Sequence, residues 1–244
     1  MRENAFEIAR QNVLTQSSAQ LGIGTLNEKT LHAVLKQFYE PCRARHEIQL
    51  GPYVADIVGE NGIIEIQTRA FHKLRDKLAY FLSISRNVTV VYPVVHTKWI
   101  CWMDPENGAI SPKRKSPKTG TVYSSFSELY KIKPLLKNPA LHIWLPLLDV
   151  TEYKLLNGWS KDKKKGATRY DRIPEALIEE VRLDQLQDYR ALLPACLEMP
   201  FTAGAFSETA GIPRKSAGIV LHIMNYIGAV SRVGKKGNQY LYTI

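Results

Sequence analysis

Between residues 47 and 103, short runs rich in Val and Ile alternate with turn residues and with one helical pattern. The strand-like runs cover residues 47–50, 53–58, 63–68, 88–95 and 98–103. A helical stripe separates the third run from the fourth and consists of Phe71, Leu74, Leu78, Phe81 and Leu82. A hairpin that leads into a crossover helix and a further strand gives a mixed sheet. We therefore expect an α/β fold with helices flanking a mixed central sheet.

A further amphipathic helix precedes these strands. Its apolar positions recur at helical spacing and are Leu31, Val34, Leu35 and Phe38. This helix is expected to begin at Thr25 and to end before Pro41, and Thr25 and Glu28 have the spacing of a capping box. Residues 1–19 are polar and weakly patterned, which predicts a loosely held N-terminal helix or arm.

The middle of the chain changes character after a Pro/Lys loop at 111–120. A helix is expected over 124–136 and a buried strand over 141–150. Residues 158–174 contain many basic residues and predict a long loop, and ordered loops of that length are commonly functional.

The last fifty residues have a pattern of their own. Helices are expected over 189–197, 202–210 and 213–226, followed by strands over 229–233 and 239–243. Three helices followed by a hairpin with a Gly/Lys tip is the order of a winged helix-turn-helix. The predicted domains are thus an N-terminal arm (1–19), an α/β domain (20–190) and a small winged-helix domain (191–244). A module of this order also serves protein interaction.

Positive charge is concentrated in one region. The chain has a formal net charge of +10, and residues 111–175 hold 14 basic and 6 acidic side chains. Such a density is typical of proteins that bind a polyanion, although it also suits a solvated loop. We expect DNA as the partner, with phosphate contacts from Lys163, Lys164, Lys165, Arg169, Arg214, Lys215, Lys235 and Lys236.

Other classes are disfavoured by what the sequence lacks. No run of about 18 apolar residues is present, and residues 1–20 have no apolar core of a signal peptide. The three cysteines are scattered and have no Cys-x-x-Cys spacing, which argues against a disulfide framework and a thiolate zinc site. We therefore expect a cytoplasmic protein without a membrane partner.

The hairpin over 53–68 carries the most informative side chains. Asp56, Glu65 and Gln67 share one face of this hairpin in either of two registers, because a slip of two residues preserves facing. A two-residue turn at Asn61-Gly62 puts Asp56 opposite Gln67, whereas a loop at 59–62 puts it opposite Glu65. Two carboxylates among Val and Ile repel each other unless they bind a cation. Their oxygens suit Mg²⁺ or Mn²⁺.

These residues, on this order of helix and strands over residues 25–103, resemble the PD-(D/E)XK nuclease superfamily, whose fold is that of restriction endonucleases. The resemblance implies a metal-dependent phosphodiesterase acting on DNA, with Asp56 and Glu65 as metal ligands. It puts Gln67 where that family usually has lysine and Glu28 at its first-helix acidic position. Resolvase-like action in such a family would require a homodimer.

Two departures from the family pattern leave a second interpretation open. Ala55 stands where proline is usual, and Gln67 carries no positive charge, so Lys73 or Lys77 on the next helix would have to supply one. Glu28 also has a purely structural interpretation as the capping-box residue. The alternative function is a catalytically inactive nucleic-acid-binding regulator or scaffold with a nuclease-like fold.

Overall fold

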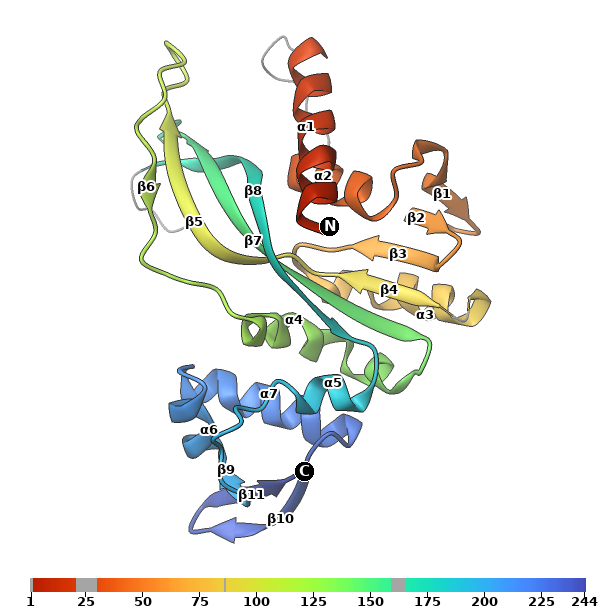
Figure 1. Ribbon diagram of the computed structural model, residues 1–244, viewed down its shortest axis with the longest axis vertical. Helices are drawn as coiled ribbons and strands as arrows, with labels where there is room; N and C mark the ends of the chain where they lie inside the picture. Colours follow the sequence, from red (N-terminus) through yellow and green to blue (C-terminus); the bar gives the residue numbers. More distant parts are fainter. Residues whose placement is uncertain (1, 21–29, 86, 159–165) are drawn as a thin grey trace.

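The Val- and Ile-rich runs form the strands of one mixed sheet (Figure 1). The computed structural model describes residues 2–20, 30–85, 87–158 and 166–244. In that part of the chain the sheet contains β1 (His46–Leu50), β2 (Tyr53–Gly59), β3 (Gly62–Ile66), β4 (Val88–Val91), β5 (Val94–Met103), β6 (Arg114–Lys115), β7 (Leu141–Leu155) and β8 (Thr168–Leu183). Strands β1, β2 and β3 are antiparallel neighbours, β3, β4 and β7 run parallel, and β8 is antiparallel to β7. The predicted α/β class with a mixed central sheet is confirmed.

Strands β4 and β5 lie end to end along one edge of β7, with one register from Val88 to Val95 and a shift before Lys98. They are separated at Pro93, which has no N–H group to donate to a neighbouring strand. The run over 88–95, predicted as one strand, is therefore divided. Strand β3 pairs with β4 as far as Ile66 and Val91, so the carboxyl ends of these two parallel strands lie side by side at the same edge of the sheet.

Strand β8 corrects the prediction of a long basic loop, because residues 168–174 already belong to it. Pro174 lies in β8 where the register with β7 shifts near Val150, a bulge position that tolerates proline. The ladder follows β7 nearly from end to end, from Ile143 to Leu155. Tertiary pairing thus makes a strand of a segment rich in charged residues.

Helices cover both faces of the sheet (Figure 1). The α-helices of the described residues are α1 (Arg2–Gln20), α2 (Thr30–Tyr39), α3 (Arg75–Ile84), α4 (Phe126–Leu129), α5 (Leu186–Arg190), α6 (Ala203–Thr209) and α7 (Arg214–Ile227). The helix predicted over 124–136 is mostly 3-10 helix, because Pro134 lies inside it. The helix expected over 189–197 is confined to α5 and ends at Arg190.

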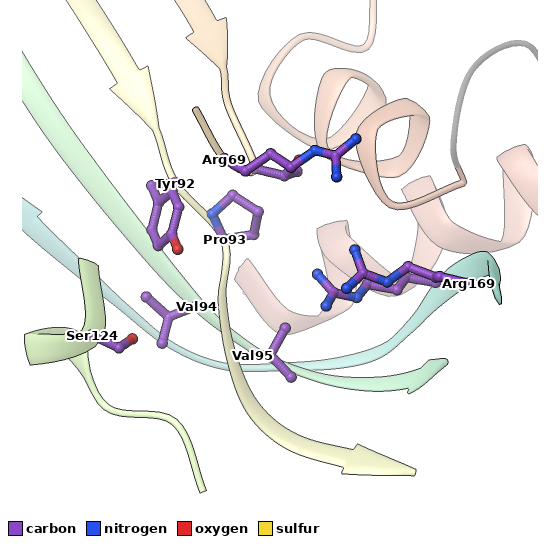
Figure 2. A pocket seen from close by; sticks show the side chains of 9 residues that line it. Arg69, Tyr92, Pro93, Val94, Val95, Ser124 and Arg169 are labelled. Carbon is purple, nitrogen blue, oxygen red and sulfur yellow. The ribbon is translucent and has the colours of Figure 1, made fainter. Parts of the chain in front are cut away.

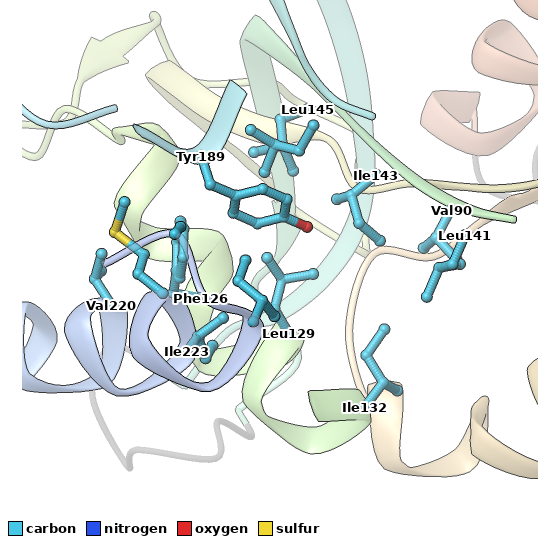
Figure 3. Close-up of a cluster of buried hydrophobic side chains, with 14 of the residues drawn as sticks. Val90, Phe126, Leu129, Ile132, Leu141, Ile143, Leu145, Tyr189, Val220 and Ile223 are labelled. Carbon is cyan, nitrogen blue, oxygen red and sulfur yellow. The ribbon is translucent and has the colours of Figure 1, made fainter. Parts of the chain in front are cut away.

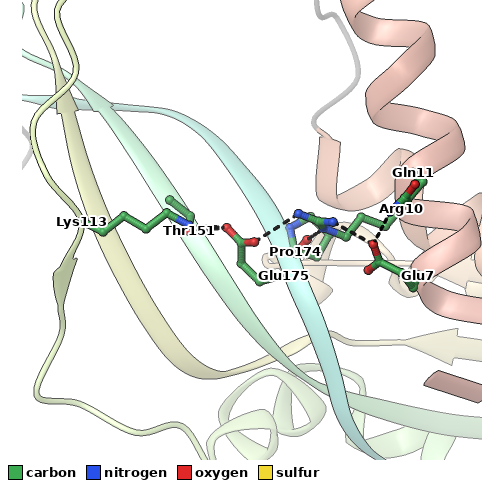
Figure 4. Close-up of polar contacts among 7 residues, drawn as sticks. All are labelled: Glu7, Arg10, Gln11, Lys113, Thr151, Pro174 and Glu175. Carbon is green, nitrogen blue, oxygen red and sulfur yellow. Dashed lines mark hydrogen bonds and ion pairs between the residues drawn. The ribbon is translucent and has the colours of Figure 1, made fainter. Parts of the chain in front are cut away.

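The N-terminal helix is not loosely held. Phe6, Ala9 and Val13 of α1 are buried against α2 and the sheet. Figure 4 shows Arg10 reaching β8, where its Nε donates to the Pro174 carbonyl at 2.8 Å and its guanidinium pairs with Glu175 at 3.2 Å. These contacts fix α1 on the sheet although its sequence is weakly amphipathic.

The C-terminal segment forms a second, three-stranded sheet with α6 and α7. Its strands are β9 (Phe201–Thr202), β10 (Ser231–Lys236) and β11 (Gln239–Thr243), in the order β10-β11-β9. Thr202 is the N-cap of α6 and its hydroxyl accepts a hydrogen bond from the Ala205 amide at 3.2 Å, and Gly228 is the C-cap of α7 in the left-handed region. Both boundaries agree with the sequence prediction.

One hydrophobic core joins the C-terminal segment to the main sheet. Figure 3 shows Val220 and Ile223 of α7 beside Phe126 and Leu129 of α4, with Tyr189 between them and the sheet. A separate core on the opposite face contains Phe6 and packs α1 and α2 on the sheet. Among the described helices, none has the length and apolar character needed to cross a membrane.

Candidate active site

Asp56 and Glu65 lie opposite each other where β2 and β3 part. The ladder runs to the pair Ile57–Ile64, which selects the second of the two registers that the sequence allowed. Beyond that pair, side chains take over the hydrogen bonds. The Ile66 amide donates to Asp56 Oδ2 at 2.7 Å, and the Asp56 amide donates to Glu65 Oε2 at 3.5 Å. Both carboxylates are therefore held by backbone groups.

Glu65 is a buried carboxylate that forms an ion pair with a lysine. Its side chain is 6% exposed, and Lys77 Nζ from α3 donates to Oε1. Burial and the neighbouring charge of Asp56 raise the pKa of Glu65 to about 7, against the opposing effect of Lys77. The site thus concentrates more negative charge than Lys77 alone compensates, which is the electrostatic condition for binding a cation.

His32 joins the site from α2, and sequence analysis assigned it no role. Its Nε2 lies 3.2 Å from Asp56 Oδ2 and 3.2 Å from the Ile66 carbonyl oxygen. The helical spacing that buries Leu31 and Leu35 also places His32 beside the apolar stripe, which is the signal that could have identified it. Strands β2 and β3 and helices α2 and α3 therefore all contribute side chains here.

The predicted neighbours of the carboxylates are only partly brought together. Gln67 follows β3, is half-buried, and its amide donates to the Val91 carbonyl at 2.9 Å. Lys73 lies exposed on a 3-10 helix over Phe71–Lys73, and the contact with Glu65 is made by Lys77 instead. The Glu28 prediction, like the capping box with Thr25, lies outside the described residues.

The donors at this site are suited to a hard divalent cation. Asp56 and Glu65 offer carboxylate oxygens from facing strands, and such oxygens are the preferred ligands of Mg²⁺ and Mn²⁺. Within residues 30–85, 87–158 and the other described segments, no group of three or more His, Cys, Asp and Glu side chains has the spacing of a metal site. Asp56 and Glu65 are thus the pair that would hold such a cation.

The predicted nucleic-acid contacts fall into three groups. Lys163, Lys164 and Lys165 lie outside the described residues. Arg169 is on β8, where its guanidinium pairs with buried Glu152 at 3.1 Å. The C-terminal cations Arg214 and Lys215, in the first turn of α7, and Lys235 and Lys236, on β10, are all exposed. The last two precede the Gly237-Asn238 turn and do not form the tip itself.

Comparison with known proteins places the site within a family. Residues 29–184 match a family described as Domain of unknown function (DUF8091). The chain belongs to the DUF8091 family. The DUF8091 match extends from the start of α2 to the end of β8 and so includes both carboxylates and Lys77.

A relative extends the similarity beyond the DUF8091 domain. An uncharacterized protein of Treponema pallidum (strain Nichols) is 31% identical over 228 residues, which cover 90% of this chain and 86% of that protein. No solved structure matches the chain.

Proposed function

We propose that this DUF8091 protein is a metal-dependent nuclease that hydrolyses phosphodiester bonds in DNA, with a restriction-endonuclease-like core and a C-terminal winged helix. The observation that carries the proposal is the convergence of Asp56, Glu65 and Lys77 where β2 and β3 part. Two carboxylates beside one lysine form the constellation that the PD-(D/E)XK resemblance implies for phosphodiester hydrolysis.

Each side chain has a distinct role in the proposed reaction. Asp56 and Glu65 would hold Mg²⁺ or Mn²⁺, and such an ion polarises the scissile phosphate and lowers the pKa of an attacking water. Lys77 supplies positive charge next to Glu65, where negative charge develops on the phosphate oxygens. His32, 3.2 Å from Asp56 Oδ2, orients that carboxylate.

Lys77 can supply the positive charge that Gln67 lacks. The family pattern has a lysine at the position of Gln67, two residues after the glutamate. Here the ammonium group that contacts Glu65 belongs to Lys77 on α3, the helix that connects β3 to β4. A lysine from a neighbouring element can serve the same electrostatic purpose, because the field depends on the position of the charge and not on its place in the sequence.

The C-terminal segment supports DNA binding by a winged helix. Helices α6 and α7 are followed by the β10–β11 hairpin, and β9 completes its sheet. Arg214 and Lys215 lie exposed at the start of α7, the end of a recognition helix that meets the bases in helix-turn-helix docking. On the hairpin, Lys235 and Lys236 are exposed and suited to phosphate contacts.

The test is cleavage of a supercoiled plasmid in Mg²⁺ or Mn²⁺, with EDTA as the blank. Asp56→Asn should lower the rate by at least about 100-fold, and Lys77→Ala by about 10- to 100-fold. Two exposed neighbours serve as matched controls, Asp76→Asn on α3 and Lys73→Ala before it, and both should retain wild-type rates. Equal loss in Asp56→Asn and Asp76→Asn would contradict the site.

A second candidate function is favoured by Gln67 alone. Because this amide carries no charge, a nuclease-like fold that binds DNA without cleaving it is the alternative. Gel-shift binding of the same plasmid fragment by the wild-type chain, with no cleavage in either metal ion, would establish the regulator or scaffold and reject the nuclease.

A further inference from the structure

A cavity of about 310 Å³ opens past the carboxyl ends of the parallel strands β3 and β4. Its polar lining comprises Arg69, Arg169, Arg172, Thr68, Ser124 and Tyr92. Figure 2 shows Arg169 on one side and Tyr92, Val94 and Ser124 on the other, with Arg69 above Pro93 between them. The volume lies at the lower end of the range of small-molecule sites, about 300–1,000 Å³.

The cavity has an identifiable structural origin. Gln67 makes the last backbone bond between β3 and β4, to the Val91 carbonyl, and Pro93 then interrupts the edge of the sheet. The chain turns away at Ala70, which has a φ of 60° in the left-handed region. Ligands of α/β proteins commonly bind where neighbouring strands separate beyond their carboxyl ends. The place and the polar lining are both typical of ligand-binding sites.

The charge around the cavity is strongly unbalanced. Buried Glu152 pairs with Arg172 at 2.8 Å and Arg169 at 3.1 Å, and Lys98 Nζ lies 3.6 Å from it. Arg69 has no ion-pair or hydrogen-bond partner among the described residues. Three cations therefore contact Glu152, and Arg69 adds a fourth positive charge to the lining, so that the excess of positive charge favours a bound anion.

The lowered pKa of Arg169 agrees with this excess of positive charge. Burial and the nearby charges of Arg172 and Arg69 lower the pKa of its guanidinium, against the effect of Glu152. Burial and the nearby charge of Glu128 raise the pKa of the Tyr92 hydroxyl, against the smaller opposing effect of Arg172. Guanidinium and hydroxyl groups thus face one volume.

We propose that this cavity binds a phosphate group, presented either by a polynucleotide strand or by a free mononucleotide. Arg69, Arg169 and Arg172 supply fork-shaped donors that match phosphate oxygens, and Thr68 adds a hydroxyl donor. Thr68 follows Glu65 by three residues, at most about 10 Å of extended chain, so the cavity and the carboxylates lie at the same end of β3. The proposal concerns binding alone and stands whether or not the chain cleaves DNA.

The test is titration calorimetry with the full chain in EDTA, so that no cleavage occurs. The probes are inorganic phosphate, dAMP and a single-stranded oligonucleotide. Arg69→Ala removes a cation that has no carboxylate partner, and Ser124→Asp adds an anion to the cavity without removing a cation. Each should weaken binding by about tenfold or more. Arg114→Ala, which changes the same charge at an exposed position of β6 outside the cavity, should alter binding less than about twofold.

The probes separate the two sources of the phosphate. Binding of dAMP that is lost in Arg69→Ala identifies a mononucleotide site. Binding of the oligonucleotide alone, lost in the same variant, identifies a strand. Wild-type binding of all three probes by both Arg69→Ala and Ser124→Asp, or no binding of any probe by the wild type, overturns the proposal.

Discussion

At the scale of single residues, the acidity of a carboxyl group depends on its burial and on the charges that surround it. Glu65 and Glu60 are both glutamates of one hairpin, yet the side chain of Glu65 is 6% exposed and that of Glu60 is 82% exposed. Only Glu65 faces another carboxylate across the strands, and its altered acidity follows from that position.

The raised pKa of Glu65 predicts a pH dependence of stability. A carboxyl whose pKa rises on folding stabilises the folded state below its ordinary value of 4.5, and this contribution is lost as the pH rises through about 7. The shift corresponds to about 3 kcal/mol. In EDTA, the unfolding free energy of the wild type should therefore fall more between about pH 5 and pH 8 than that of Glu65→Gln.

Urea unfolding at the two pH values measures this difference. Glu60→Gln is the matched control, because Glu60 is exposed and should leave the wild-type pH dependence in place. Identical pH dependence in the wild type and Glu65→Gln would show that Glu65 is an ordinary carboxylate.

At the scale of elements, α1 depends on packing more than on its own helical pattern. Phe6 is 1% exposed and meets the Phe38 ring edge-on at 5.4 Å. Arg10 bonds to β8 on the other side, between Glu7 and Glu175 (Figure 4). Helices gain most of their stability from tertiary contacts of this kind.

Phe6→Ala should therefore destabilise the protein by about 3–5 kcal/mol, the usual cost of removing a buried ring. Ile8→Ala on the same helix is the control, because Ile8 is 54% exposed and its loss should cost no more than about 0.5 kcal/mol. Chemical denaturation compares the two variants, and equal free energies would mean that α1 contributes nothing to the core.

At the scale of the whole molecule, the continuous core predicts cooperative unfolding. Trp99, Trp102 and Trp144 lie on β5 and β7, so their fluorescence reports on the main sheet, whereas circular dichroism reports on every helix. Ile223→Ala on α7 removes a fully buried side chain of the shared core and should cost about 2–5 kcal/mol. Both signals should shift together to the same lower midpoint.

Val233→Ala on β10, at a position that is 55% exposed, provides the comparison and should leave the midpoint unchanged within about 0.5 kcal/mol. If Ile223→Ala moved the dichroism transition and left the fluorescence transition in place, the C-terminal segment would be an independent folding unit.

Local patterns in the sequence determined the elements whose signals are short-range. The alternation over 53–68 was enough to put Asp56 and Glu65 on one face, because facing follows from a period of two. The helices expected over 202–210 and 213–226 correspond to α6 and α7, whose caps Thr202 and Gly228 act through neighbouring backbone groups.

Only the tertiary structure decided which distant groups meet. Residues 168–174 belong to strand β8 because β7 pairs with them, although the sequence predicted a loop over 158–174. Lys77 reaches Glu65 and Lys73 does not, because residues 71–73 form a 3-10 helix and α3 begins at Arg75, which changes the direction of the side chains between them. The arginines around the phosphate cavity come from segments about a hundred residues apart, and no local pattern encodes a contact over that separation.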